Sequence, residues 1–284
     1  MCSSKTTQHM QYQNSIFDAM NGMGYENETV ITKDERSLKL FSLNVNGLED
    51  IKVDTIAWYI VRGDYDIVFQ LDTQLLLKNN EWMVKLLTER LGQLTNERWI
   101  ISYNKAGPEG AKYQQRTGGQ IALVRGWLTT NLKNVRKDKS GLGFLIGLEL
   151  VVQNQPLLVI NGYWPSRPQS PNDQGLNNKM QQWMRESVIH GTPVGYIKQL
   201  IAEWSICHAI KHDGVHTVIL TGDMNSTRTK QEHGGCLEPY GQWAEEVQLF
   251  DVIGEHAEAN KVDVRTFSKH GFPVSAIFHI LINK

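Results

Sequence analysis

Polar side chains that suit phosphate chemistry follow four apolar segments of the chain. They are Asn44 and Asn46 after the first segment, Asp72 after the second, Tyr163 after the third, and Asp223 with Asn225 after the fourth. A carboxylate holds Mg²⁺ or orients a water molecule, and an amide or a phenol hydrogen-bonds to a phosphate oxygen. Groups of these types suit phosphate chemistry, but each motif is weak by itself, and a Gly-Asp pair after an apolar strand is more often a turn.

The segments that must position these groups alternate between strand and helix patterns. Apolar runs predict strands over residues 38–44, 66–71, 98–103, 120–125, 143–152, 156–163, 216–220 and 274–282. Helical patterns cover residues 50–62, 81–91 and 193–212, with a short helix near Trp243, and residues 165–178 are expected to form a loop. Because side chains at strand ends project into shared clefts, we expect one α/β domain with the polar groups gathered at one end of its strands.

The composition excludes several classes of protein. Of the 284 residues, 40% are apolar and 21% are charged, which is typical of a globular chain and excludes disorder over the whole length. The 29 basic and 30 acidic residues leave a net charge of −1, too little for nonspecific condensation onto nucleic acid or an anionic bilayer. No apolar run is long enough to span a membrane.

The N-terminal segment and the cysteines bear on the bounds of the domain and on the location of the protein in the cell. Residues 1–36 are polar and are expected to form a flexible N-terminal extension to a domain over residues 37–284. The first residues lack the apolar core of a secretory signal, and the three widely spaced cysteines favour reduced thiols. We therefore expect an intracellular protein, nuclear or cytoplasmic and not secreted.

In this order, the polar segments resemble the motifs of the endonuclease/exonuclease/phosphatase superfamily, over a span from about Leu38 to Leu281. Asn44 stands where the family has the first asparagine of Asn-x-Asn/Asp-Gly, and Asp72 stands where it has the magnesium-binding glutamate of Gln-Glu-Thr. Tyr163 stands where the family has the tyrosine of Tyr-x-Pro. Asp223 and Asn225 stand where it has Gly-Asp-x-Asn. Residues 119–124, 265–267 and 275–281 resemble segments of the endonuclease domains of LINE-type retroelements.

The resemblance implies a fold and a chemistry. The fold is a two-sheet α/β sandwich with helices on the outer faces, the deoxyribonuclease-like four-layer α/β/β/α arrangement. The activity is cleavage of a phosphodiester in nucleic acid with Mg²⁺ or Mn²⁺ as cofactor. Asp72 and Asn46 are implied to hold the metal, and the implied catalytic residues are Asp223, Asn225, Tyr163 and Asn44.

Two basic segments are candidates for binding the substrate. Tyr113 and Arg116 lie in a glycine-rich loop, and Arg228 follows the Gly-Asp-Met-Asn segment. Basic and aromatic side chains of this kind contact a polynucleotide backbone and stack on a base. Because the net charge of the chain is close to zero, a solvated surface loop is an equally good interpretation.

The sequence departs from the family pattern at the metal position and near its end. Asp72 replaces a glutamate, which shortens the side chain by one methylene and predicts weaker metal binding. Phe278 replaces the aspartate that pairs with a histidine of a later Ser-Asp-His segment, and the chain ends at Lys284 without one. His279 does not replace it, since adjacent residues of a strand point to opposite faces. We therefore expect weakened activity, a domain without its last strand, and a sheet edge available to a partner chain.

Two other functions fit the same residues. One is a phosphomonoesterase or phospholipase of the same superfamily. The other is a noncatalytic remnant or binding module, which the phenylalanine at position 278 favours.

Two weaker signals are interpreted as structural. Cys207, His208, His212 and His216 have a spacing typical of metal ligands, but Cys207 falls on the apolar stripe of a predicted helix, and solvated histidines near the helix end are the preferred interpretation. Trp164 is expected to fill the core rather than to line a cleft.

Overall fold

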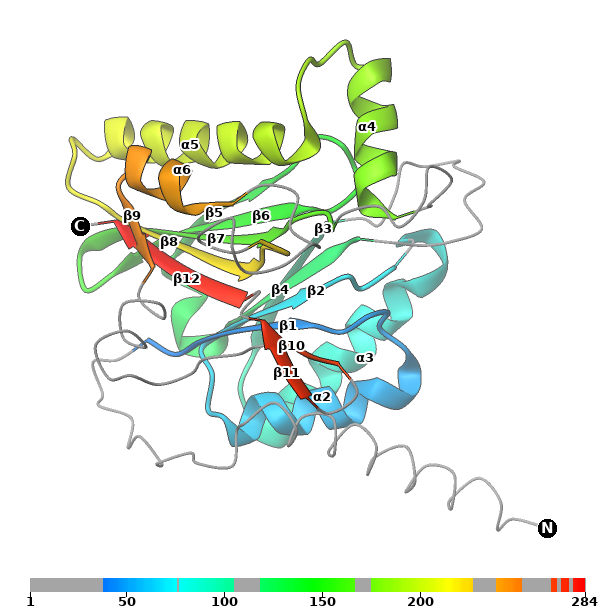
Figure 1. Ribbon diagram of the computed structural model, residues 1–284. Coiled ribbons are helices and arrows are strands. Elements are labelled where there is room, and N and C mark those ends of the chain that lie inside the picture. Colours follow the sequence, from blue (N-terminus) through cyan, green and yellow to red (C-terminus); the bar gives the residue numbers. More distant parts are fainter. Residues whose placement is uncertain are drawn as a thin grey trace.

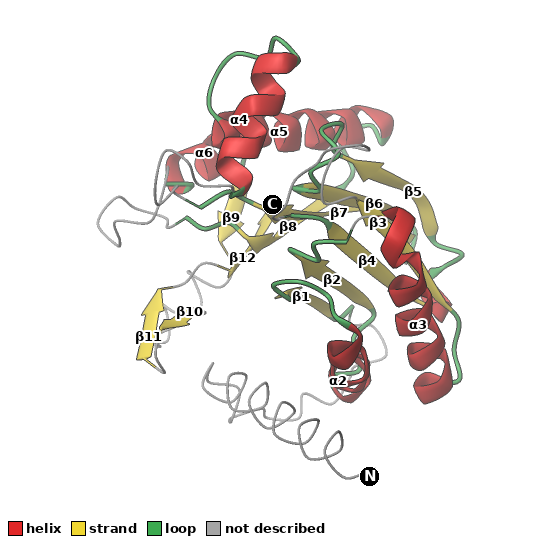
Figure 2. Cartoon of the chain, turned by 90° about the vertical axis from the view of Figure 1, so that its right-hand side faces the viewer, coloured by secondary structure: helices red, strands yellow, loops and turns green. Residues whose placement is uncertain are grey.

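The computed structural model describes residues 38–75, 77–104, 118–166, 175–226, 239–251, 267–269, 272–275 and 278–283. Two β-sheets lie face to face, with helices on both outer sides (Figures 1 and 2). Residues 1–36, predicted to be an extension, lie outside the described residues. None of the described helices is both long enough and apolar enough to cross a membrane.

The first sheet has four strands, in the order β1-β2-β4-β3. Their bounds are β1 Leu40–Asn44, β2 Ile67–Leu71, β3 Trp99–Asn104 and β4 Gln120–Arg125. Helices α2 (Asp50–Arg62) and α3 (Leu77–Thr95) cover its outer face. Val53 and Ile60 of α2 and Leu87 of α3 pack with Val68 and Leu123 of the sheet in one buried apolar cluster. Burial of this face holds the first two layers together.

The second sheet has six strands, in the order β5-β6-β7-β8-β12-β9. Their bounds are β5 Leu132–Lys137, β6 Leu145–Val152, β7 Gln155–Tyr163, β8 Thr217–Asp223, β9 Leu249–Asp251 and β12 Phe278–Asn283. Helices α4 (Leu176–Glu186), α5 (Pro193–Lys211) and α6 (Gly241–Glu246) lie on its outer side. Two short strands, β10 (Phe267–Lys269) and β11 (Phe272–Ser275), form a separate antiparallel pair, and a 3₁₀ turn over Gly126–Leu128 follows β4.

Apolar side chains of both sheets meet in a second core between the layers. Phe69 of β2 and Val124 of β4 belong to the same buried cluster as Ile146 and Leu148 of β6 and Val159 of β7. Strands buried on both faces read as continuous apolar runs, which is why they were recognisable in the sequence. The predicted four-layer α/β/β/α sandwich is confirmed.

A short polar seam crosses this inter-sheet core. Ser42 Oγ of β1 donates to Asn161 Oδ1 of β7 over 2.9 Å, and Asn161 Nδ2 donates to Gln120 Oε1 of β4 over 3.0 Å. Asn161 and Gln120 are fully buried. Hydrogen bonds between buried side chains of different elements fix how those elements lie against each other. The seam therefore fixes the two sheets relative to each other.

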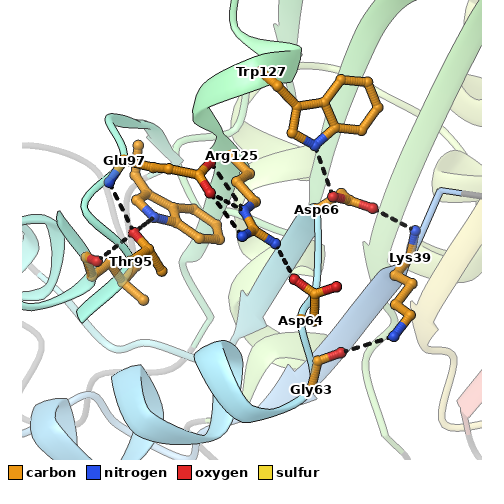
Figure 3. A network of polar contacts seen from close by, with 10 residues as sticks. Lys39, Gly63, Asp64, Asp66, Thr95, Glu97, Arg125 and Trp127 are labelled. Carbon is orange, nitrogen blue, oxygen red and sulfur yellow. Dashed lines mark hydrogen bonds and ion pairs between the residues drawn. The ribbon is translucent and has the colours of Figure 1, made fainter. Parts of the chain in front are cut away.

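A network of ion pairs closes the end of the first sheet where β2 begins and β4 ends (Figure 3). Arg125 donates from Nη2 to Glu97 Oε1 over 2.7 Å and also binds Asp64. Trp127 Nε1 and the backbone N–H of Lys39 both donate to the Asp66 carboxylate over 2.9 Å. These contacts tie the loops before β2 and β3 to the end of β4.

Several elements differ from the sequence predictions. Strand β5 and helix α4 were not predicted, and the single strand expected over residues 274–282 is instead β11 followed by β12. Cys207 is exposed, and His208 rather than Cys207 continues the buried stripe of α5, so the predictions of a buried thiol and a solvated His208 were wrong. The stripe runs through Ile197, Ile201 and Trp204 to His208, which keeps the helical steps of three and four residues.

Candidate active site

The polar residues of the four sequence segments come together where β1, β2, β7 and β8 end. Strands β1 and β2 run parallel, as do β7 and β8, so within each sheet the carboxyl ends lie at one edge. Asn44 Nδ2, from the first sheet, donates to Asp223 Oδ2, from the second, over 3.0 Å. The backbone N–H of Asn225 donates to the other carboxylate oxygen, Oδ1, over 3.1 Å. Asp223 is buried and its carboxylate is held from both sides.

Asp72 is held by the loops at the end of the first sheet. The backbone N–H of Gly118 donates to Asp72 Oδ1 over 2.7 Å, and Gln74 Nε2 donates to Oδ2 over 3.1 Å. Gln74 also donates to Asn46 Oδ1 over 3.3 Å, which links the two predicted metal ligands. Burial raises the pKa of Asp72, and these hydrogen bonds oppose the rise.

Tyr163 lies within the electrostatic field of both carboxylates. Burial is the main cause that raises the pKa of its phenol, and the negative charges of Asp72 and Asp223 add to the rise. A hydrogen bond with Asn44 acts in the opposite direction. The phenol therefore stays protonated at neutral pH and is available as a donor.

The loops at the site hold three of these residues in the left-handed backbone region. The φ angles are +44° at Asn46, +51° at Asp72 and +42° at Asn225. Asparagine and aspartate tolerate this region better than other residues with a Cβ, and such conformations cluster at functional sites.

A glycine pair allows β7 and β8 to approach closely beneath the site. Gly222 has a φ of +130°, and a Cβ atom at this position would lie 2.1 Å from the carbonyl oxygen of Gly162. The two glycines are paired in the parallel register, one residue before Tyr163 and Asp223. The glycine of Gly-Asp is thus required by packing as well as by the turn.

Two lysines beside Asp72 were missed by the sequence analysis. Lys52 of α2 donates from Nζ to the carbonyl oxygens of Val45, Asn46 and Gly47 over 3.2, 3.2 and 2.8 Å. Lys179 of α4 is only 6% exposed. The positive charges of both lysines lower the pKa of Asp72 against the effect of burial. Neither lysine belongs to a motif, because Lys52 lies on α2, after the loop that carries Asn46, and Lys179 lies on α4, remote in sequence from Asp72.

The donor set suits a small hard cation. Among the residues that the structure describes, no three His, Cys, Asp or Glu side chains are grouped to hold a metal ion. Mg²⁺ does not need such a group, because it is usually bound through one or two carboxylates and keeps several waters. Asp72, with the Asn46 amide linked to it through Gln74, is a donor set of this type. The same finding gives no support to a metal site at Cys207, His208, His212 and His216.

The remaining candidate residues divide into three groups. Tyr113, Arg116 and Arg228 lie outside the described residues. Trp164 is fully buried, as predicted, and its carbonyl oxygen accepts from Asn225 Nδ2 over 2.9 Å. The backbone of Phe278 pairs with Asp223 in the antiparallel register of β12 and β8. Directly opposite residues share a face of a sheet, so position 278 lies on the same face as Asp223 and position 279 on the other.

Solved structures with the same fold include nucleases. An AP endonuclease from Archaeoglobus fulgidus matches with a TM-score of 0.55 at 13% identity, and a 3'-5' exonuclease from Neisseria meningitidis with 0.54 at 13%; each comparison covers 87% of both chains. An endonuclease/exonuclease/phosphatase family protein from Leptotrichia buccalis matches with 0.51 at 14% identity, covering 87% of this chain and 88% of the other. No protein-family model and no curated protein sequence matches the chain. At these identities, the likeness establishes the deoxyribonuclease-like fold.

Proposed function

We propose that the chain is a metal-dependent phosphodiester hydrolase that acts on nucleic acid. The observation that carries the proposal is the hydrogen bond that Asn44 Nδ2 donates to Asp223 Oδ2 over 3.0 Å, next to Tyr163, which is paired with Asp223 in the register of β7 and β8. Two carboxylates, two amides and a phenol from four separate loops thereby face a common region. The resemblance of residues 119–124 to retroelement endonucleases favours that type among the nucleases.

Asp223 is the group that orients and deprotonates the attacking water in this proposal. Its two oxygens accept from Asn44 Nδ2 and from the Asn225 backbone, so the carboxylate cannot rotate freely. A fixed carboxylate directs its remaining lone pairs at one position, which is the requirement for general-base catalysis.

Asp72 and Asn46 are the residues that would hold Mg²⁺ or Mn²⁺. When bound, such an ion supplies positive charge to the phosphate and to the leaving oxygen. Gln74 keeps the two ligands in place, since its amide donates to both. Tyr163 O–H would donate to a phosphoryl oxygen, and burial raises the pKa of this phenol.

The test is nicking of supercoiled plasmid by the full chain with Mg²⁺ and with chelator. Asp223→Asn is expected to lower the rate by about 10²- to 10⁴-fold, because a positioned general base is lost. Asp213→Asn removes an exposed carboxylate at the end of α5 and serves as the matched control. Nicking that persists in chelator, or that Asp223→Asn leaves unchanged, contradicts the proposal.

Two other functions are supported by particular observations. A Neisseria protein of the same fold, with a TM-score of 0.52 at 13% identity and 87% of both chains covered, is a 3' phosphatase bound to a product DNA hairpin. Release of inorganic phosphate from a 3'-phosphorylated oligonucleotide, without plasmid nicking, would favour that activity for this chain. A noncatalytic binding module is favoured by Phe278 opposite Asp223. Binding of the oligonucleotide without turnover in any metal would favour that alternative.

A further inference from the structure

Asp138 is a buried carboxylate that the proposed chemistry does not use. It directly follows β5, is 5% exposed, and accepts hydrogen bonds from both sheets and from the loop of residues 138–144 that leads to β6. The donors are Asn104 Nδ2 of β3, Ser140 Oγ, and the backbone N–H groups of Ser140, Phe144 and Leu145. The three backbone bonds measure 3.1, 3.0 and 3.2 Å. This carboxylate fixes the 138–144 loop, because its loss would leave several buried donors unsatisfied.

One arm of the 138–144 loop reaches the segment that holds Asp72. The N–H of Leu142 donates to Ser140 Oγ over 2.9 Å, and the carbonyl oxygen of Leu142 accepts from the N–H of Gly119 over 3.0 Å. Gly118 lies directly against the same carbonyl, since a Cβ atom at this glycine would be 2.3 Å from its oxygen. The N–H of Gly118 in turn donates to Asp72 Oδ1 over 2.7 Å. The loop therefore supports the donor that fixes the Asp72 carboxylate.

The other arm of the loop reaches the part of the site that belongs to the second sheet. Phe144, whose N–H donates to Asp138, accepts with its carbonyl oxygen from the N–H of Tyr163 over 2.8 Å. Tyr163 is paired with Asp223 in the parallel register of β7 and β8. The 138–144 loop thus contacts the backbone beside candidate site residues of both sheets, and Asp138 is the group that both arms have in common.

We propose that Asp138 is a positioning residue for the candidate active site, which keeps Asp72 and Tyr163 aligned with each other through the two arms of the 138–144 loop. The inference rests on the proposed function, because it concerns the alignment of the same reacting groups. Catalytic groups act only within a narrow range of geometry, and a displacement of about 1 Å lowers a rate by up to about 10²-fold even when its cause is remote from the chemistry.

The first measurement is amide hydrogen exchange of the full chain, followed by NMR, with the amides of α5 as the reference for global unfolding. Asp138→Asn keeps the size of the side chain but turns an NH₂ group toward N–H donors. It is expected to speed exchange at Gly119 and Tyr163 by about tenfold or more. Glu149→Gln is the matched control, because Glu149 is also buried and is bound by Lys211 of α5 over 2.7 Å. This control is expected to leave exchange at the two amides unchanged relative to the reference.

The second measurement separates positioning from stability. At a temperature where the variants are folded, Asp138→Asn is expected to lower kcat for plasmid nicking by about tenfold or more and to leave KM for the plasmid within about twofold. It is also expected to weaken Mn²⁺ binding, measured by isothermal titration calorimetry without substrate, by about tenfold. A purely structural role would leave these values unchanged in the folded protein, as is expected for Glu149→Gln.

Ser140→Ala keeps the inference testable if Asp138→Asn does not fold. This variant removes the hydroxyl that accepts from the N–H of Leu142, and it leaves the backbone bonds of Phe144 in place. Exchange is therefore expected to become faster at Gly119 and to stay unchanged at Tyr163.

The outcomes distinguish failure of this inference from failure of the proposed function. If the parent chain nicks plasmid but Asp138→Asn changes neither kcat nor Mn²⁺ affinity, the inference is overturned and the proposed function stands. Unchanged exchange at Gly119 in both the Asp138→Asn and Ser140→Ala variants also overturns the inference alone. If the parent chain does not nick plasmid and Asp72→Asn leaves Mn²⁺ binding unchanged, both are overturned.

Discussion

Asn44 and Asp223 lie 179 positions apart in the sequence, and the Asn44 amide donates to the Asp223 carboxylate over 3.0 Å. Asn44 ends a strand of one sheet and Asp223 a strand of the other. This bond therefore joins the two halves of the candidate active site, and a single substitution at Asn44 removes it.

Asn44→Ala is expected to lower the rate of plasmid nicking by about 10²-fold, because the Asp223 carboxylate loses one of its two fixed donors. The rate is measured with saturating Mg²⁺ so that a difference in metal affinity does not change the measured rate. Gln182→Ala, which removes an exposed amide from α4, is the control. Equal rates for Asn44→Ala and the parent chain would show that Asp223 needs no such orientation.

Phe278→Asp is expected to increase nicking by about tenfold. The register places position 278 opposite Asp223 on the same face of the sheet, where the family resemblance implies an aspartate. A positioned acid–base group contributes about 10²- to 10⁴-fold, and only part of this is expected without its histidine partner. His279→Asp places the same charge on the opposite face and is expected to give no gain. Equal gains in both variants would contradict the assignment of faces.

His208 is expected to make stability depend on pH between about 4 and 6.5. Burial, and next the nearby His212, lowers its pKa from 6.5 to about 4, and Glu149, His216 and Arg136 also act on it. The unfolded chain takes up a proton near pH 6.5, whereas the folded chain does so only near pH 4. The contribution to stability is therefore complete above pH 6.5 and is lost as the pH falls toward 4, by up to about 3 kcal/mol.

Urea unfolding between pH 4 and 8 measures this dependence. His208→Leu fits the apolar stripe of α5 and is expected to flatten the part of the curve below pH 6.5. His190→Gln changes an exposed histidine and is expected to leave the curve unchanged. A curve for His208→Leu that parallels the parent curve would assign the pH dependence to other groups.

Arg125→Met is expected to destabilise the fold by about 1–3 kcal/mol without changing the nicking rate of the folded protein. The variant leaves Glu97 and Asp64 without their shared partner. These groups lie at the end of β4 away from Gln120, about 17 Å from the site by strand length. Thermal unfolding and nicking at 20 °C test the two parts. A fall in rate at equal folded fraction would show that the two ends of the sheet are coupled.

The elements that could be predicted from the sequence are those whose apolar residues form continuous runs or recur at a regular spacing. β6, β7 and α5 were recognisable because their side chains are buried in runs or in stripes. β5 is an edge strand with the sequence LKNVRK, whose polar residues give no strand signal. The first three residues of α4 fall in the loop expected over residues 165–178, and residues 179–186 were assigned no element, because the segment is rich in polar residues.

The candidate site was predictable only where a side chain follows its own strand. Asn44, Asp72, Tyr163 and Asp223 each end or directly follow a strand, so one topology brings them together. Lys52 and Lys179 enter from helices, and their positions depend on how those helices pack. Packing of this kind has no signal in a single sequence. The stripe of α5 was assigned to Cys207 instead of His208 for the same reason, because the packing of the helix decides which of two adjacent residues is buried. Adjacent helical positions differ by about 100° in direction.

The seam of Ser42, Asn161 and Gln120 bears on how motion is transmitted through the molecule. Asp72 follows a strand of the first sheet and Asp223 ends a strand of the second, so any sliding of one sheet over the other would separate the residues of the candidate site. Three amide and hydroxyl side chains in this largely apolar interface resist such sliding. Under the proposed function, loss of their hydrogen bonds would therefore lower the activity even though every candidate site residue is still present.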